Sequence, residues 1–595
     1  MNMASANAIK GNENVRTEPN QDDSQFIAAP KGVLLQAKEL TIRTRAGLTL
    51  LSEISFHIEP GDLVALTGIS YTGKSALLQC LAGLRPPAHG QVLIDGVDLY
   101  ANLKAFHPSI GYVPSDFPLP QNLTVAEVMQ EGTRLRLPRR MSDRDRKLRI
   151  QTLLATMDLT KAVHSRVGSL SRIEKRKLNL ALELIGFPGL LLLDAPTEQL
   201  TPFEELQMTI LLKELARQGI TIIQVDQRAR TAGLSDQVIF LAPGGLLAWF
   251  GPPDEASIYL RSLVPKGIAK DLFGLREALE VLTNPQVQEG VEWAKRFKAN
   301  PAYQKYVDDP QHDRYPDLML QTHPLLRLRL KNNSREKVPP RIIPRANALQ
   351  KYILLIRRNA RLLWRDKTVF SMLVLPPVIA LVEILFASAA GSEPDRVPFI
   401  FGLLVFLVLL TSALLVQNEI SKERVVYQHE NRTGTVLFPY VLSKVWLVGL
   451  LAVYQGLVWM VLHAVATGLA GGLPVLLSYG ITVFLISLVG GIVGLLVSAL
   501  ARKPMSATNW LLLFTIPQLI FSGSIIPAGN LAVPFQVVSW IDPLRYALDA
   551  LLRTSGYGEG LAGALLMDWF VMAIISLCLI IILLGIQGRT GNTST

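Results

Sequence analysis

This chain of 595 residues contains few cysteines and lacks a long apolar stretch near its start. The two cysteines, Cys80 and Cys578, stand in very different sequence contexts. So few thiols argue against a disulfide and are typical of a protein that faces the reducing cytosol. The first residues are polar and lack the apolar core of a signal peptide, so we expect residues 1–32 to form a disordered tail.

Long hydrophobic runs are absent from roughly the first 340 residues, whereas the remainder contains runs long enough to cross a bilayer. The chain is also too long for one domain. We expect a membrane domain at 367–595 with about six spans, near residues 368–390, 397–416, 441–466, 476–501, 507–521 and 568–586.

The formal net charge of +11 is compatible with a nucleic-acid partner or with a membrane surface. The position of the basic residues favours the membrane, because they gather just before the first apolar run. These residues are Arg357, Arg358, Arg361, Arg365 and Lys367. We therefore predict membrane lipid as a partner and no nucleic acid.

Residues 346–366 show helical amphipathicity. Apolar residues recur on one helical face, and the basic residues lie off it. This pattern predicts a connecting helix that lies along the membrane surface, with a soluble surface helix as the weaker alternative. The apolar face consists of Leu349, Tyr352, Ile353, Ile356, Ala360 and Leu363.

The distribution of charge between the spans predicts the orientation. Lys422, Arg424 and Arg432 follow the second span, and Arg502 and Lys503 follow the fourth. Because basic connections stay in the cytosol, we expect a multi-pass protein of the cell membrane (inner or plasma) with both termini cytoplasmic. The semi-apolar stretch 525–566 is expected to dip back into the outer leaflet.

The segment 68–75 fits the phosphate-loop pattern GxxxxGK[ST] and lies between an apolar strand-like run and a helix-like run. In such a loop backbone N–H groups surround phosphate oxygens, the lysine reaches the outer phosphates and the final hydroxyl binds Mg²⁺. The predicted nucleotide-binding residues here are Gly68, Ser70, Gly73, Lys74 and Ser75. Tyr71 stands at a position that usually holds a small residue.

A second Mg²⁺ anchor is predicted at Asp194, which ends the apolar run 190–193. Alone, such a run is usually a core strand. At this distance after a phosphate loop, and within alternating strand and helix patterns over residues 33–262, it is more specific. ATP and Mg²⁺, the latter on Ser75 and Asp194, are the predicted cofactors.

Several segments together resemble an ABC transporter half of the G-subfamily type. The resemblance implies an α/β P-loop nucleotide-binding domain at 33–262 and an all-α polytopic membrane domain. The mixed composition of 263–345, with several prolines near its end, predicts short helices and a linker. The resemblance also implies that Glu423 and Arg424 belong to a cytosolic coupling helix that touches the nucleotide domain, with a solvated charged loop as the weaker alternative. The matching segments are 110–114, 123–127, 170–174, 193–197, 250–253, 423–430 and 541–546.

This chain departs from the family pattern at the positions used for hydrolysis. The resemblance places Ala195 where the catalytic Glu belongs, Asp226 where the switch His belongs and Ser115 where the Q-loop Gln belongs. The signature keeps Ser171, but Arg172 and Ile173 replace its two glycines, and Thr201 replaces the D-loop Asp. No confident catalytic residue remains, although Arg172 is a candidate phosphate contact.

Three functions stay open. The chain is a transporter half with degenerate sites that pairs with a more intact half, a homodimeric regulator or scaffold that binds nucleotide without cycling, or an active homodimeric ATPase with a non-standard base. The resemblance implies export of a hydrophobic or amphipathic small molecule. Its identity is not readable from the sequence.

Polar and small residues inside the spans have structural and functional interpretations. Glu383 in the first span is either a contact in the substrate path or a structural partner of another polar residue. Gly490, Gly491 and Gly494 predict a close helix-packing face.

Overall fold

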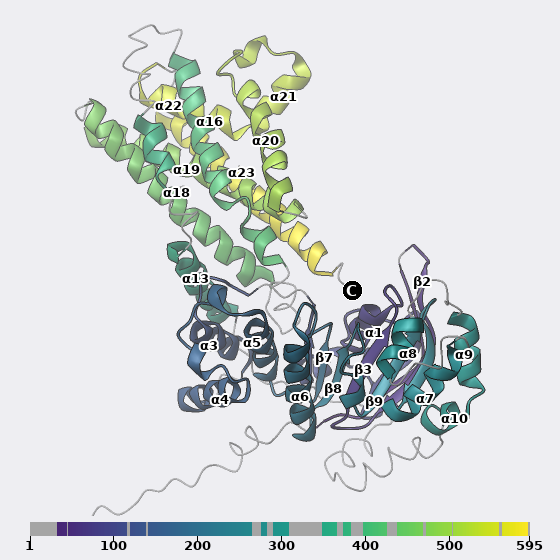
Figure 1. Cartoon of the computed structure of the whole chain (residues 1–595). Coiled ribbons are helices and arrows are strands. Elements are labelled where there is room, and N and C mark those ends of the chain that lie inside the picture. The colour runs from purple at the N-terminus through teal and green to yellow at the C-terminus, as the bar shows by residue number, and fades with distance from the viewer. Residues whose placement is uncertain are drawn as a thin grey trace, which may run out of the picture.

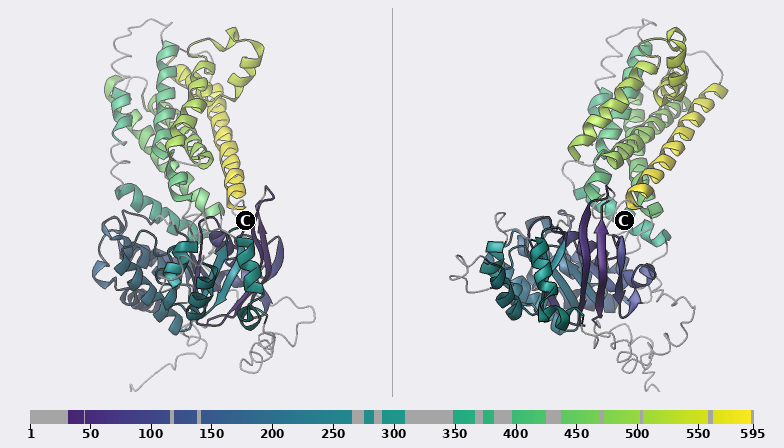
Figure 2. Two further views of the ribbon diagram at one scale, coloured as in Figure 1. Left: turned by 45° about the vertical axis from the view of Figure 1, so that its right-hand side comes forward. Right: turned by 90° about the vertical axis from the view of Figure 1, so that its right-hand side faces the viewer.

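The computed structural model describes residues 32–44, 46–115, 119–137, 141–264, 275–282, 290–308, 348–365, 373–381, 397–424, 437–467, 472–501, 504–557 and 562–592. An α/β domain lies on one side and a helical bundle rises from it (Figures 1 and 2). The end of the last helix lies on the side of the bundle nearest the α/β domain. The fold class predicted from the sequence is confirmed.

Two sheets form the α/β domain. One has four antiparallel strands in the order β2-β1-β4-β5, and the other has six strands in the order β10-β9-β3-β8-β7-β6. In the larger sheet every neighbouring pair is parallel except β10 and β9. The strands are β1 (Leu35–Arg43), β2 (Thr49–Ile58), β3 (Leu63–Gly68), β4 (His89–Ile94), β5 (Val97–Asp98), β6 (Ile110–Val113), β7 (Leu190–Leu193), β8 (Thr221–Val225), β9 (Gln237–Ala242) and β10 (Leu246–Gly251).

The parallel strands are buried on both faces, which explains their continuous apolar sequence. In β7 the four leucines alternate between two cores, with Leu190 and Leu192 in one and Leu191 and Leu193 in the other. Helices cover both faces of this sheet (Figure 1). The helices in this part of the chain are α1 (Lys74–Leu81), α2 (Leu103–Phe106), α3 (Val125–Arg136), α4 (Asp143–Thr156), α5 (Arg172–Leu184), α6 (Pro202–Arg217) and α7 (Pro253–Leu263).

The sequence after α7 contributes to the same core. Helices α8 (Leu275–Leu282), α9 (Gly290–Lys298) and α10 (Pro301–Tyr306) follow, where a linker of short helices was expected. Trp293 and Phe297 of α9 are buried, and the ring of Phe297 lies 5.3 Å from that of Trp249 in β10. Part of the expected linker is therefore packed against the α/β domain, because its aromatic residues cover the edge strand β10.

The bundle consists of long apolar helices. Four of the described helices are long and apolar enough to cross a membrane, and a shorter apolar helix covers Ser506–Phe521. Most of the expected first span, including Glu383, lies outside the described residues. The helices are α13 (Ala348–Arg365), α16 (Val397–Val416), α18 (Leu437–Thr467), α19 (Gly472–Leu500), α20 (Pro504–Phe521), α21 (Val533–Ile541), α22 (Pro543–Thr554) and α23 (Ala562–Asn592).

The glycines of α19 pack as the sequence predicts. A Cβ atom on Gly490 would lie 2.4 Å from the carbonyl oxygen of Leu409, and one on Gly494 would lie 2.4 Å from that of Ala413. Both carbonyls belong to α16. No side chain separates the two backbones, so α19 packs closely against α16. Helix α19 is also largely buried within the bundle.

Candidate functional site

The candidate site lies at one edge of the six-stranded sheet. The phosphate loop follows β3, Asp226 follows β8, Asp194 follows β7 and Ser115 comes two residues after β6. Neighbouring parallel strands end at the same edge, so the sheet brings these sequence-distant residues together. The position expected to hold the switch residue lies between the phosphate loop and the Mg²⁺ anchor.

The phosphate loop has the backbone geometry that a phosphate cradle requires. Gly73 has a φ of 88°, in the left-handed region that favours glycine, and it caps the N-terminus of α1. Gly68 has a φ of 143°, and a Cβ there would lie 2.3 Å from the carbonyl oxygen of Leu241. Tyr71 also has a positive φ, 66°, and its side chain is fully exposed. Its ring therefore points away from the protein, and the cradle tolerates it.

Lys74 is held inside the loop. Its Nζ donates to the carbonyl oxygen of Gly68 at 2.8 Å and to that of Ile69. Burial lowers the pKa of Lys74 to about 8, and Asp194 partly opposes this shift. The Lys74 ammonium thus donates to backbone carbonyl oxygens. A bound phosphate oxygen would take their place as its hydrogen-bond acceptor.

Ser75 and Asp194 fit a magnesium ion. The Ser75 hydroxyl donates to Asp194 Oδ1 at 3.2 Å, which brings a hydroxyl from α1 and a carboxylate from the end of β7 together. Burial raises the pKa of the Asp194 carboxyl, and its hydrogen bond with Ser75 opposes this. Mg²⁺ prefers oxygen ligands and binds through one or two carboxylates plus phosphate oxygens, so these two residues suit a nucleotide-bound Mg²⁺.

Asp226 is engaged in local structure. It is 4% exposed, and its Oδ1 accepts from the backbone N–H of Arg228 at 3.2 Å. Its Oδ2 accepts from the backbone N–H and the hydroxyl of Thr231, each at 3.1 Å. The hydroxyl of Thr231 in turn accepts from Thr209 on α6. The carboxylate therefore caps the loop after β8 and fastens it to α6.

Ala195 and Ser115 bring no catalytic side chain to the site. Ala195 is buried and has a φ of 53°, a left-handed conformation that a residue with a Cβ adopts only at a cost. The backbone carbonyl of Ser115 accepts a hydrogen bond from Arg176 on α5. At this position the contact to the signature helix comes from the main chain.

The signature segment is capped by its own helix. The Ser171 hydroxyl accepts from the backbone N–H of Glu174 and donates to the Glu174 carboxylate, which also accepts from the backbone N–H of Ser171. This reciprocal pair is a capping box at the start of α5. Arg172 donates to the backbone carbonyl of Gln199 at 3.3 Å. In this chain the arginine thus contacts the segment that follows Asp194.

Thr201 begins α6 in the same way. Its hydroxyl accepts from the backbone N–H of Glu204, and the Glu204 carboxylate accepts from the backbone N–H of Thr201. The sequence already carried the signal for both boxes, a Ser or Thr followed by Glu three residues later. Asp226 also bonds locally, to Arg228 and Thr231, but the bond that joins its loop to Thr209 depends on the tertiary fold.

The expected coupling residues lie at the end of the bundle that faces the α/β domain. Glu423 forms ion pairs with Lys444 of α18 at 3.0 Å and with Arg358 of α13 at 3.7 Å. Lys444 is 1% exposed and also pairs with Glu419 at 3.0 Å. Glu423 therefore binds α18 and α13, the connecting helix, to the end of α16.

The direct contact with the α/β domain comes from another residue of α13. Arg361 pairs with Glu131 of α3 at 3.3 Å. Arg424 donates to the backbone carbonyls of Ala499 and Ala501 at the end of α19. Sequence reasoning singled out Glu423 and Arg424 and missed the pair of Arg361 and Glu131.

Comparisons with known proteins match both regions. A family model described as "ABC transporter" matches residues 51–198, and one described as "ABC-2 type transporter" matches residues 350–554. An ABC transporter ATP-binding/permease protein of Mycobacterium tuberculosis is 28% identical over 559 residues, which cover 88% of this chain and 59% of the relative.

Two eukaryotic relatives match this chain to different extents. The rat protein named broad substrate specificity ATP-binding cassette transporter is 35% identical over 37% of this chain and 34% of its own length. ABC transporter G family member 4 of Arabidopsis thaliana is 26% identical over 84% of this chain and 82% of its own length. The chain thus spans less than two thirds of the mycobacterial and rat relatives.

Proposed function

We propose that this chain binds ATP with Mg²⁺ and exports a hydrophobic or amphipathic small molecule, while it hydrolyses ATP weakly or not at all by itself. The chain belongs to the ABC transporter family and carries its nucleotide-binding domain before an ABC-2 type membrane domain. The G-type relatives support the assignment to export. The observation that carries the proposal is the contrast between the formed phosphate loop and the capped residues around it.

ATP binding rests on the loop and its metal ligands. Backbone N–H groups of residues 68–75 and the ammonium of Lys74 would hold the phosphates, with Ser75 and Asp194 on Mg²⁺. The N-terminus of α1 adds a partial positive charge at the same point. Bound Mg²⁺ would neutralise the charge between the outer phosphates.

Weak hydrolysis rests on the missing general base and on the capped carboxylate. Ala195 has no group that accepts a proton from water, and Asp226 is bound by three donors of its own loop. Losing a general base alone typically lowers a rate by about 10²–10⁴-fold. The carboxylate of Asp226 would also repel a γ-phosphate at neutral pH.

Coupling between the domains rests on a chain of ion pairs. Glu131 of the nucleotide-binding domain holds Arg361, and one helical turn earlier Arg358 holds Glu423. Lys444 joins Glu423 and Glu419 inside the bundle. A displacement of α3 would therefore pull α13 and, through it, the ends of α16 and α18.

The functional unit that we propose is a dimer. In the family two nucleotide-binding domains meet head to tail, so each ATP lies between one chain's phosphate loop and the other's signature. In a homodimer both sites carry Ala195 and the self-capped Ser171. In a heterodimer an intact partner would supply the base at one of the two sites, and that site is the candidate for turnover.

ATP binding and turnover by the purified full-length chain in lipid nanodiscs test the proposal. We expect saturable binding of a fluorescent ATP analogue that disappears in Lys74→Ala, and phosphate release close to that of the variant. Phosphate release well above that of Lys74→Ala would contradict weak hydrolysis. Absence of binding would contradict the nucleotide function.

The capped carboxylate of Asp226 favours a second candidate, a membrane regulator or scaffold that binds nucleotide without cycling. Copurification from native membranes separates the two. A second ABC half together with export of a hydrophobic substrate supports the transporter half. A homodimer that changes the activity of another membrane protein, without export in the presence of ATP, supports the regulator.

A further inference from the structure

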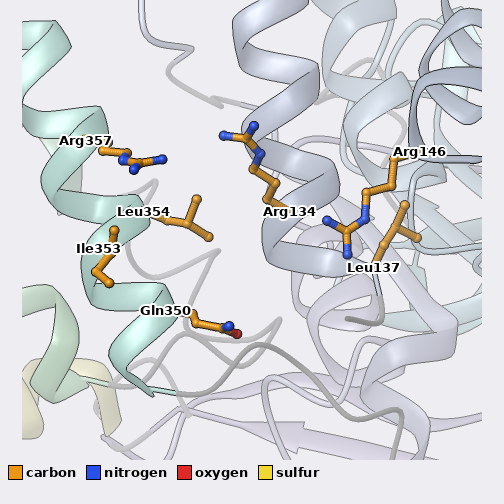
Figure 3. A pocket seen from close by; sticks show the side chains of 7 residues that line it. All are labelled: Arg134, Leu137, Arg146, Gln350, Ile353, Leu354 and Arg357. Carbon is orange, nitrogen blue, oxygen red and sulfur yellow. The ribbon is translucent and has the colours of Figure 1, made fainter. Parts of the chain in front are cut away.

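A cavity lies between the connecting helix and the nucleotide-binding domain. It has a volume of about 310 Å³ and is lined by side chains of α3, α4, α13 and the residue after α3. Figure 3 shows Arg134, Arg146 and Arg357 around it, from three different helices. Three guanidinium groups from two domains thus meet at one cavity.

Of the three arginines, Arg146 has an acidic partner. Asp143 lies 3.8 Å from Arg146, but its side chain is 94% exposed. Within the described part of the chain, Arg134 and Arg357 have no ion pair or hydrogen bond. The side chains of Arg134 and Arg357 therefore line the cavity without an acidic partner among the described residues, and an anion between them would be attracted by both. Guanidinium groups suit phosphate in particular, because their planar donors match its oxygens.

The rest of the lining consists of one polar residue, Gln350, and three aliphatic residues. Leu137, the residue after α3, is buried, and Leu354 and Ile353 of α13 face the cavity beside the arginines. A site for a small soluble anion has no need of such a wall. Guanidinium groups with aliphatic side chains beside them fit an amphiphile whose headgroup is anionic.

The location places this cavity beside the membrane domain. Helix α13 is bound to α18 by a hydrogen bond from Asn359 to Ser443 at 3.1 Å, and it separates the bundle from α3 (Figure 1). The cavity is also next to the contact between the domains, because Arg357 is one turn from Arg361 and Arg134 is one turn from Glu131. A ligand here would touch both sides of that contact.

From these observations we propose that the cavity binds the phosphate headgroup of an anionic phospholipid from the adjoining leaflet. Arg134, Arg146 and Arg357 would contact the phosphate, and Leu137, Ile353 and Leu354 the first carbons beyond it. The volume is near the lower end of small-molecule sites, which suits a headgroup and not a whole lipid. The bound lipid would hold α13 against α3 and α4. This site does not depend on ATP binding or on transport.

Native mass spectrometry of the full-length chain tests the site. The protein is taken from nanodiscs that contain phosphatidylcholine with or without phosphatidylglycerol. We expect the wild type to retain phosphatidylglycerol in preference to phosphatidylcholine. We expect the double variant Arg134→Gln and Arg357→Gln to bind it roughly thirtyfold more weakly. Arg144→Gln, which removes an exposed arginine of α4 outside the cavity, is the matched control and should behave like the wild type.

A second variant protects the test against misfolding. Leu354→Trp keeps all three arginines and fills the cavity, and it should also reduce retention while its thermal midpoint in phosphatidylcholine stays near that of the wild type. Equal retention of phosphatidylglycerol by the wild type and both cavity variants overturns the proposal, as does equal retention of the two lipids.

A soluble arm separates the two sources of phosphate. Inorganic phosphate is added to the detergent-solubilised chain, and we expect no displacement of phosphatidylglycerol and no rise in the thermal midpoint. If inorganic phosphate alone raises the midpoint and the double variant abolishes the effect, the cavity binds free phosphate and the lipid assignment is wrong.

Discussion

Two groups of residues in the candidate site differ in what their side chains bind: those proposed to hold phosphate and Mg²⁺, and those at the positions that the family uses for hydrolysis. Lys74, Ser75 and Asp194 contact one another or the loop, at the place where phosphates and Mg²⁺ would lie. Asp226, Ser171 and Thr201 instead satisfy donors of their own helices and loops. Asp226 follows β8, the strand next to β3 and its phosphate loop, yet in the described structure its side chain binds only its own loop.

Restoring the residues that the family uses for hydrolysis should have the largest effect. The set Ser115→Gln, Arg172→Gly, Ile173→Gly, Ala195→Glu and Asp226→His is expected to raise ATP turnover by about 10²–10⁴-fold, because it returns a general base and its partners. Phosphate release by the purified chain in nanodiscs measures this.

The same set combined with Lys74→Ala is the control and should show no turnover. Glutamate at position 195 must adopt the left-handed conformation seen for Ala195, so some loss of stability is expected as well. If the wild-type chain already releases phosphate as fast as the restored variant, the proposed loss of hydrolysis is wrong.

Breaking the group proposed to hold phosphate should lower ATP affinity by about a hundredfold. Lys74→Ala removes a charged donor to the outer phosphates, and such bonds are each worth roughly 1.5–3 kcal/mol. Equilibrium binding of a fluorescent ATP analogue to the full-length chain gives the affinity. Lys161→Ala, which removes an exposed lysine, should leave it unchanged. Equal affinities for Lys74→Ala and the wild type would mean that the loop does not hold the phosphates.

Asp226→Ala should separate structure from nucleotide binding. The change removes an acceptor from three donors, the two of Thr231 being buried, and is expected to cost about 2 kcal/mol of stability, or roughly 5 °C in the thermal midpoint. ATP affinity should stay within about twofold, because Asp226 binds its own loop. Asp226→Asn keeps one carbonyl acceptor and should lose less. A drop in affinity at an unchanged midpoint would show that Asp226 acts on the nucleotide.

Thr201→Ala should have the smallest effect, about 1 kcal/mol, because it removes the cap of α6. The backbone N–H and the hydroxyl of Thr201 also lower the pKa of Glu204. The part of the capping box that involves the Glu204 carboxylate is therefore present above the ordinary carboxyl pKa and is lost as the pH falls through the lowered pKa of Glu204. Thermal melts from neutral to acidic pH should therefore show a shrinking difference between variant and wild type. Thr201→Ser keeps the cap and should show no difference at any pH.

The sequence predicts the parts of this molecule that depend on local pattern. The segment 68–75 and the leucines before Asp194 each carry their own spacing and predict the candidate phosphate site, whose residues the sheet brings together. The glycines of α19 predict the packing with α16, which the structure confirms.

Contacts between distant segments could not be predicted in this way. Three examples are the bond from Thr209 to Thr231, the pair of Arg361 and Glu131, and the three arginines of the cavity. In each, only the tertiary fold brings the segments together. The capping roles of Ser171 and Thr201 were readable from their local pattern, but resemblance to a family motif gave the same residues a different interpretation.

The aromatic contact between α9 and β10 has a practical consequence for dividing the chain. A fragment that ends near residue 262 would uncover parts of Trp249 and Phe240, because Phe297 and Trp293 would be removed with α9. Such a fragment would expose a wide apolar surface in water and is expected to aggregate. A nucleotide-binding domain intended for expression on its own should therefore extend at least to Asp308, so that α10 also keeps its bond from Tyr306 to Glu255 of α7.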